Sequence, residues 1–179
     1  MFDWLFAAPR RTLGLITAAC VAGLAFALYL QHVVGLEPCP MCIVQRYALI
    51  LVGVAAGLAA IFRSRGAWIA GSLFGLLFAG FGAFVAARQS WLQWYPPEIA
   101  TCGRDFYGMI ETFPLKRAVP IIFRGSGDCT KVDWTFLGGS IANWSFVAFV
   151  VVALVFLGLL LRQLASPARR TATTSRARA

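Results

Sequence analysis

The sequence predicts an all-α membrane protein: a four-transmembrane-helix bundle with two loops on the outer side and both termini cytoplasmic. The first observation is composition. The 179 residues are 60% hydrophobic and only 13% charged, whereas a soluble domain is about 45–50% apolar and about 25% charged. The second observation is a set of long apolar runs, and the third is an uneven distribution of arginine. Together they exclude a water-soluble enzyme, a coiled coil and a disordered chain.

The apolar runs are each long enough to cross a hydrocarbon core of about 30 Å. Lipid leaves the backbone only helices or a closed barrel, and these runs are continuously apolar rather than alternating, so we expect helices. The uncharged part of the second run starts at Tyr47, but we expect its helix to begin earlier, near Pro40. The expected transmembrane helices are residues 12–30, 42–62, 67–87 and 141–161.

The segments outside these helices are short, with one exception. The expected N-terminal segment is 1–11 and the cytoplasmic link is 63–66. The outer loops are 31–41, which contains Cys39, and 88–140, which contains Cys102 and Cys129. The remaining segment, 162–179, is a small, polar and basic tail that we expect to be disordered.

Two pairs of glycines lie four residues apart inside the expected helices. They are Gly53 and Gly57 in the second helix, and Gly71 and Gly75 in the third. Small residues at this spacing let transmembrane helices approach closely. Glycine is also common in membrane helices without such a role, but we favour helix packing.

The distribution of basic residues predicts the orientation. The short loop 31–41 has no lysine or arginine, whereas basic residues gather in the segments expected on the opposite side: Arg10, Arg11, Arg63, Arg65, Arg162, Arg169, Arg170, Arg176 and Arg178. By the positive-inside rule, both termini are cytoplasmic and, in a bacterium, both loops are periplasmic. Topology thus accounts for the net charge of +9, and no nucleic-acid partner is expected.

A cleaved signal peptide is the alternative for the first helix. Arg10 and Arg11 precede an apolar stretch that ends with Ala25-Phe26-Ala27, which is similar to a cleavage site. The stretch is too long for a signal sequence, however, and three further helices follow it. We therefore expect a retained transmembrane helix.

The chemistry-bearing residues are cysteines. Cys20 lies within the first helix, where a thiol usually behaves as a small hydrophobe, and we assign it no function. Cys39 and Cys42 follow the first helix, whereas Cys102 and Cys129 follow the third. Two membrane crossings separate these groups, so all four lie on the same, outer face. Disulfides persist on that face of a bacterial membrane, so the set suggests two disulfides.

Cys39-Pro40-Met41-Cys42 opens the second helix. Proline suits a first turn, so Cys39 is the expected N-cap and Cys42 lies in the first turn, where the helix dipole favours a thiolate. Arg46 lies one turn deeper on the same face. An arginine so placed pairs with something or faces a cavity. The expected partner is the Cys42 thiolate or a reducible polar group bound beside it, and the alternative is an arginine snorkelling to lipid headgroups.

The cysteines allow three other interpretations. A Cys₄ zinc site is disfavoured by the spacing of Cys102 and Cys129 and by the oxidising face, so no metal is expected. A thioredoxin-type site requires a βαβ surround that the sequence lacks. A structural disulfide between Cys102 and Cys129 remains the alternative to disulfide exchange between the two groups.

Three blocks resemble one family. They are Gln31–Tyr47, which contains His32 and the Pro-Cys-Pro-Met-Cys run up to Arg46, then Leu92–Pro96 leading to Cys102, and Gly125–Cys129 followed by Trp134–Gly138. Together they resemble the signature of the DsbB family of bacterial disulfide bond formation proteins, and the similarity extends over about residues 12–161. One departure is Arg88-Gln89-Ser90, where some members have a histidine.

The resemblance implies a four-helix inner-membrane oxidase, a protein-dithiol:quinone oxidoreductase. Such an enzyme re-oxidises a periplasmic DsbA-type thiol oxidase and passes the electrons to a membrane quinone, with ubiquinone favoured over menaquinone. It implies that Cys102 and Cys129 form the partner-facing disulfide and that Cys102 forms the mixed disulfide with DsbA. Cys129 then exchanges with Cys39, which frees Cys42 as the thiolate beside the quinone. Arg46 matches the family's quinone-side arginine.

Two rival functions fit parts of the same pattern. The first is a vitamin K epoxide reductase-like quinone-linked oxidase, but in that family the Cys-x-x-Cys follows the loop cysteines, whereas here Cys39 and Cys42 precede them. The second is a non-catalytic membrane scaffold with structural disulfides. A scaffold predicts cysteines that stay oxidised in the presence of reduced DsbA, whereas catalysis predicts that they cycle.

Overall fold

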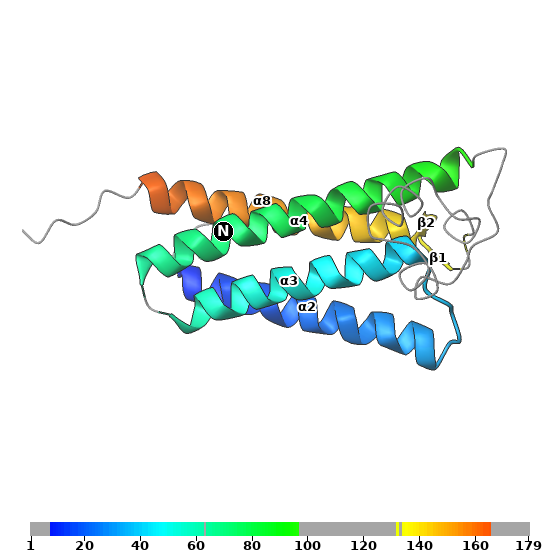
Figure 1. The fold of residues 1–179 in the computed structure, drawn as a ribbon, viewed down its shortest axis with the longest axis horizontal. Helices are drawn as coiled ribbons and strands as arrows, with labels where there is room; N and C mark the ends of the chain where they lie inside the picture. Colours follow the sequence, from blue (N-terminus) through cyan, green and yellow to red (C-terminus); the bar gives the residue numbers. More distant parts are fainter. Residues whose placement is uncertain (1–7, 63, 97–131, 133, 166–179) are drawn as a thin grey trace, which may run out of the picture.

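The computed structural model describes residues 8–62, 64–96, 132 and 134–165. This part of the chain is nearly all helical, and its helices are α2 (Pro9–His32), α3 (Pro40–Ile61), α4 (Arg65–Trp94) and α8 (Ile141–Ala165) (Figure 1). All 4 are long and apolar enough to cross a membrane. The predicted fold class, a four-helix membrane bundle, is confirmed. The side of the membrane on which each end lies stays a prediction.

The helices extend beyond the expected membrane spans. The helix α3 begins at Pro40, as expected from its sequence. The largest difference is in α4, which continues through Arg88 to Trp94, so residues 88–94 are helical, although the sequence analysis placed them in the long loop. Hydropathy marks where a segment leaves the apolar core, and Arg88 ends the apolar run. The backbone hydrogen bonds of a helix do not depend on that boundary, so the helix continues past it.

Consecutive helices pack side by side in alternating directions (Figure 1). The helix α3 packs against α2 and α4, and α4 packs against α8. No comparable contact joins α2 to α8 within the described residues. The bundle is therefore closed along three helix pairs and less tightly packed along the fourth, between α2 and α8.

Glycines bring the helices together, as their spacing predicted. A Cβ atom at Gly71 of α4 would overlap Ala59 of α3, and one at Gly75 would overlap the ring of Phe156 in α8. The closest neighbour of such an atom at Gly53 is Cys20 Cβ in α2, at 3.2 Å. Cys20 is thus buried against a glycine of the neighbouring helix, which fits the packing role expected for it.

We expect Gly71→Ala to lower the free energy of unfolding by about 1–3 kcal/mol, because the added methyl group meets Ala59 with no space to relax into. Gly80 is the matched control, because it lies on the same helix with nothing within 4 Å of an added Cβ. Unfolding in mixed detergent micelles measures both variants. Equal stability of Gly71→Ala and Gly80→Ala would contradict the packing assignment.

A short hairpin lies at the end of the bundle where α3 begins (Figure 1). Strand β1 (Thr135–Phe136) pairs antiparallel with β2 (Gly139–Ser140). Leu137 and Gly138 between them both have positive φ, which two-residue hairpin turns that match the strand twist require. Ser140 then starts α8, because its Oγ accepts a hydrogen bond from Asn143 N at 3.3 Å. The hairpin thus joins α8 to the bundle end that carries Cys39.

Candidate active site

The Cys-x-x-Cys motif has the local geometry that its sequence predicts. Cys39 is the N-cap of α3 with φ −66° and ψ 160°, and Pro40 occupies the first turn. The backbone N–H of Cys42 donates to Cys39 Sγ at 3.3 Å. The Cys39 sulfur therefore satisfies one of the N–H groups that a helix start leaves unpaired.

The two sulfurs of the motif are neighbours. Cys39 Sγ and Cys42 Sγ lie 2.9 Å apart. Cys39 is buried, at 7% exposure, and Cys42 is half-buried. A disulfide has an S–S length of about 2.05 Å, so only a small side-chain movement separates this arrangement from a bonded pair. The motif is therefore positioned to gain and lose a disulfide without a change in the helix.

Two glutamines that were not among the predicted site residues lie beside the sulfurs, one of them in the Arg88-Gln89-Ser90 run where the sequence departs from some family members. Gln89 of α4 donates through Nε2 to Cys39 Sγ and to Cys42 Sγ, each at 3.3 Å. Gln45 of α3 donates through Nε2 to Gln89 Oε1 at 2.7 Å. Both glutamines are buried, at 7% and 4% exposure for Gln45 and Gln89. Polar residues in an apolar helix were the available signal, but their meeting depends on how α3 and α4 pack.

Arg46 is fixed by hydrogen bonds to α2. Its guanidinium donates to Gln31 Oε1 and to the backbone oxygen of Ala27 at 3.1 Å. The Cys42 sulfur, one of its two expected partners, is not among its hydrogen-bond acceptors in the described part of the chain. Arg46 is half-buried and lines the same cavity as Cys42. This agrees with an arginine that faces a cavity rather than one that reaches to lipid headgroups.

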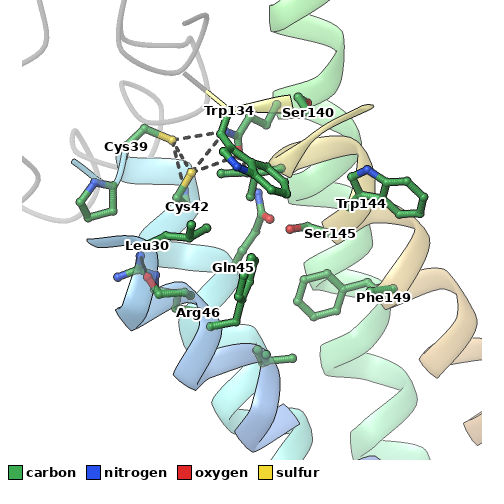
Figure 2. Close-up of a pocket in the computed structure, with 18 of the residues that line it drawn as sticks. Leu30, Cys39, Cys42, Gln45, Arg46, Trp134, Ser140, Trp144, Ser145 and Phe149 are labelled. Atoms are coloured by element: carbon green, nitrogen blue, oxygen red, sulfur yellow. Dashed lines mark hydrogen bonds between the residues drawn. The ribbon is translucent and has the colours of Figure 1, made fainter. Parts of the chain in front are cut away.

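A cavity of about 720 Å³ begins at the cysteines and extends into the bundle. Cys42, Gln45 and Arg46 lie on one side of it, and Trp144 and Phe149 of α8 lie on the other (Figure 2). Its apolar walls come from α2, α3 and α8. These wall residues are Gly23, Phe26, Leu30, Leu49, Val52, Ala148, Phe149 and Val152.

Aromatic side chains cover the outer part of the cavity. Trp134 meets Phe26 of α2 edge-on, with ring centroids 6.2 Å apart, and stacks on Phe136 at 6.0 Å. Trp144 donates through Nε1 to the backbone oxygen of Phe136 at 2.9 Å. The hairpin thus bridges α2 and α8 above the cavity, although these helices do not pack closely on each other.

The residues of the cavity fit a quinone. A quinone has a flat ring with two oxygen acceptors and an apolar tail. Arg46 and Gln45 have N–H groups beyond those in the hydrogen bonds described above and lie at the cysteine end, and the aromatic and aliphatic walls suit the ring and the tail. The volume is also within the range of about 300–1,000 Å³ that is usual for ligand pockets.

The structure brings together three of the predicted site residues: Cys39, Cys42 and Arg46 all line the cavity. Cys102 and Cys129 lie outside the described residues, so the second disulfide and the Cys₄ zinc alternative stay untested. The chain nevertheless leaves the helices after Trp94 and re-enters at the hairpin, both at the end that carries Cys39 (Figure 1). His32 is exposed at the end of α2.

The fold and the site define a multi-pass membrane protein with a thiol pair at the mouth of an intramembrane cavity. A family profile described as disulfide bond formation protein DsbB matches residues 9–159. Disulfide bond formation protein B of Paracidovorax citrulli is 74% identical over 160 residues, which cover 89% of this chain and 91% of the relative. The protein of the same name from Acidovorax sp. (strain JS42) is 72% identical, with 90% and 93% covered. That of Aromatoleum aromaticum is 48% identical, with 91% and 98% covered.

This chain belongs to the DsbB family. The family supports a role as a disulfide-forming oxidoreductase of the membrane, and it separates the chain from the vitamin K epoxide reductase-like alternative. This family assignment agrees with the resemblance found in the sequence around Cys39 and Cys42.

Proposed function

We propose that this protein re-oxidises a periplasmic DsbA-type dithiol oxidase and transfers the electrons to a membrane quinone, so that disulfide bonds continue to form in periplasmic proteins. One observation carries the proposal: the Cys39–Cys42 pair opens into an intramembrane cavity whose polar end holds Arg46 and whose walls are apolar. A structural disulfide has no need of such a cavity. An oxidant dissolved in the lipid would reach the sulfurs through it.

The exchange steps follow from the family's pattern. The Cys102–Cys129 disulfide takes two electrons from the partner's dithiol, through a mixed disulfide at Cys102, and becomes two thiols while the partner forms its disulfide. Cys129 then attacks Cys39 of the Cys39–Cys42 disulfide, which forms a Cys39–Cys129 bond and releases Cys42 as a thiolate. Attack of Cys102 on Cys129 restores the loop disulfide and releases Cys39, so the Cys39–Cys42 pair is left reduced. Each exchange breaks one S–S bond and forms another, so the electron count balances.

The residues at the cavity mouth hold the reduced pair ready for oxidation. The N-terminus of α3 stabilises a thiolate at Cys42. Arg46 keeps a positive charge at the polar end of the cavity because Gln31 and Ala27 hold its guanidinium in place. A bound quinone supplies the acceptor for two electrons and two protons. The apolar walls would limit the access of water to the thiolate and would accommodate the apolar tail of a quinone.

The proposal includes a location. The protein lies in the bacterial inner membrane with both termini cytoplasmic, and the cysteine end of the bundle faces the periplasm. The absence of lysine and arginine from residues 31–41 supports this orientation. An oxidising compartment on that side agrees with a function in disulfide formation.

Quinol formation tests the function. The purified protein is mixed with reduced DsbA and one quinone at a time, and the quinone absorbance is followed. We expect one quinol per disulfide formed in DsbA, with ubiquinone used faster than menaquinone. A chain whose cysteines stay oxidised while DsbA stays reduced would instead be the non-catalytic scaffold.

A further inference from the structure

The amide of Gln89 contacts both sulfurs of the Cys-x-x-Cys motif. Its Nε2 atom lies 3.3 Å from Cys39 Sγ and 3.3 Å from Cys42 Sγ. A carboxamide nitrogen carries two hydrogens, enough for one hydrogen bond to each sulfur. Gln89 is only 4% exposed, so water competes little for its amide. In such an environment an unpaired polar group is costly, which favours the hydrogen bonds to the sulfurs.

Gln45 fixes which way the amide of Gln89 points. Gln45 Nε2 donates to Gln89 Oε1 at 2.7 Å, which holds that oxygen as an acceptor. The oxygen also lies within reach of the neutral Cys42 thiol, at 3.7 Å from Cys42 Sγ, but the nitrogen is the nearer amide atom, at 3.3 Å. A thiolate accepts hydrogen bonds but cannot donate them. Ionisation of Cys42 therefore favours this same orientation.

We infer that Gln89 is a further catalytic residue, whose amide N–H, oriented by the positioning residue Gln45, donates to the Cys42 thiolate and stabilises it at the mouth of the cavity. The inference rests on the proposed function only in that Cys42 carries the thiolate during turnover. The donor is neutral and does not titrate. Among the described residues that line the cavity, the charged side chains are Arg46 of α3 and Glu37 of the loop before α3. Besides Cys39 and Cys42, the lining contains one further thiol, Cys20 of α2. The lining residues of α4 and α8 are uncharged.

The test measures the reactivity of the Cys42 thiol alone, with no quinone and no protein partner. Full-length protein carrying Cys39→Ser is reduced, and alkylation of the Cys42 peptide by iodoacetamide is followed by mass spectrometry from pH 5 to pH 9. Serine is a good N-cap, so this background keeps the start of α3. We expect Gln89→Leu to slow alkylation at pH 7 by about 10-fold and to move the rate profile to higher pH, because a hydrogen bond to a charged group is lost.

Further variants separate thiolate stabilisation from structural effects. Gln89→Met keeps the length of the side chain without its donor, so it replaces Gln89→Leu if that variant fails to fold. Gln45→Leu leaves the donor present but free to turn, so we expect a smaller slowing, about 3-fold. Gln163 is the matched control: it is a buried glutamine in the last turns of α8, and neither amide atom has a partner in the described part of the chain. Gln163→Leu should leave the profile unchanged.

The outcomes are distinguishable from a failure of the proposed function. Alkylation at the parent rate in Gln89→Leu and Gln89→Met would overturn the inference, and so would an equal slowing in Gln163→Leu. A protein that never reduces quinone would fail the quinol assay, whatever its alkylation profile. In the parent background, loss of the donor should lower kcat and leave the KM for DsbA unchanged, whereas a general loosening of the bundle would alter both.

Discussion

Cys42→Ser is expected to lower turnover with reduced DsbA and quinone by on the order of a thousand-fold or more. A serine hydroxyl can neither form a disulfide with Cys39 nor carry a thiolate beside the cavity. The same loss is expected for Cys39→Ser, and for serine at Cys102 or Cys129 if the loop disulfide relays electrons. Quinol formation followed by absorbance measures all four variants.

Cys20→Ser is the matched control for these substitutions. Cys20 also lines the cavity, but in its deeper part, where it is buried against Gly53. We expect turnover close to that of the parent protein. If Cys42→Ser retains turnover, or if Cys20→Ser loses it to the same degree, the assignment of the redox pair is wrong.

Arg46→Ala is expected to raise the KM for quinone and to lower kcat/KM by about 10- to 100-fold. The variant loses the positive charge at the polar end of the cavity, which contributes charge-assisted hydrogen bonds to an oxygen acceptor. The substitution should affect the stability of the fold less than it affects quinone use. A partly exposed arginine with hydrogen bonds to one neighbouring helix contributes only about 1–2 kcal/mol to the free energy of unfolding. Steady-state kinetics at several quinone concentrations, beside unfolding in detergent, give the two quantities.

Gln31→Ala separates the two roles of Arg46. It removes the acceptor that ties the guanidinium to α2 but keeps the charge in the cavity. We expect a loss of stability similar to that of Arg46→Ala with a smaller rise in quinone KM. An Arg46→Ala protein with the parent's KM and rate would show that Arg46 serves only to join α2 to α3.

The sequence was sufficient for features that depend on neighbours along the chain. Helices α2, α3, α4 and α8 follow from apolar runs, because lipid leaves the backbone few alternatives. The N-cap role of Cys39 follows from the proline after it, and the glycine contacts at Gly71 and Gly75 follow from a four-residue spacing. Each of these depends on residues within one continuous segment of the chain.

The sequence did not predict features that depend on contacts between helices. Gln45 lies three residues after Cys42 on α3, a spacing that places the two on one face, but Gln89 lies on α4, and no spacing along the chain reveals that it meets Gln45 and the sulfurs. Gln31 belongs to the Gln31–Tyr47 block that resembles the family signature, but its hydrogen bond to Arg46 depends on how α2 packs against α3. The continuation of α4 to Trp94 was missed for another reason: hydropathy reports the membrane boundary rather than the end of the helix.

The central claim is that the Cys39–Cys42 pair passes its electrons directly to a quinone in the adjoining cavity. The most direct measurement reduces purified protein that carries Cys102→Ser and Cys129→Ser, so that no loop thiol can exchange with the pair, removes the reductant without oxygen, and adds one equivalent of ubiquinone in the absence of DsbA. Mass spectrometry of alkylated peptides then locates the disulfide while absorbance counts the quinol. We predict a Cys39–Cys42 disulfide that forms together with one quinol. Quinol formation with both of these thiols still reduced, or no quinol at all, would contradict the claim.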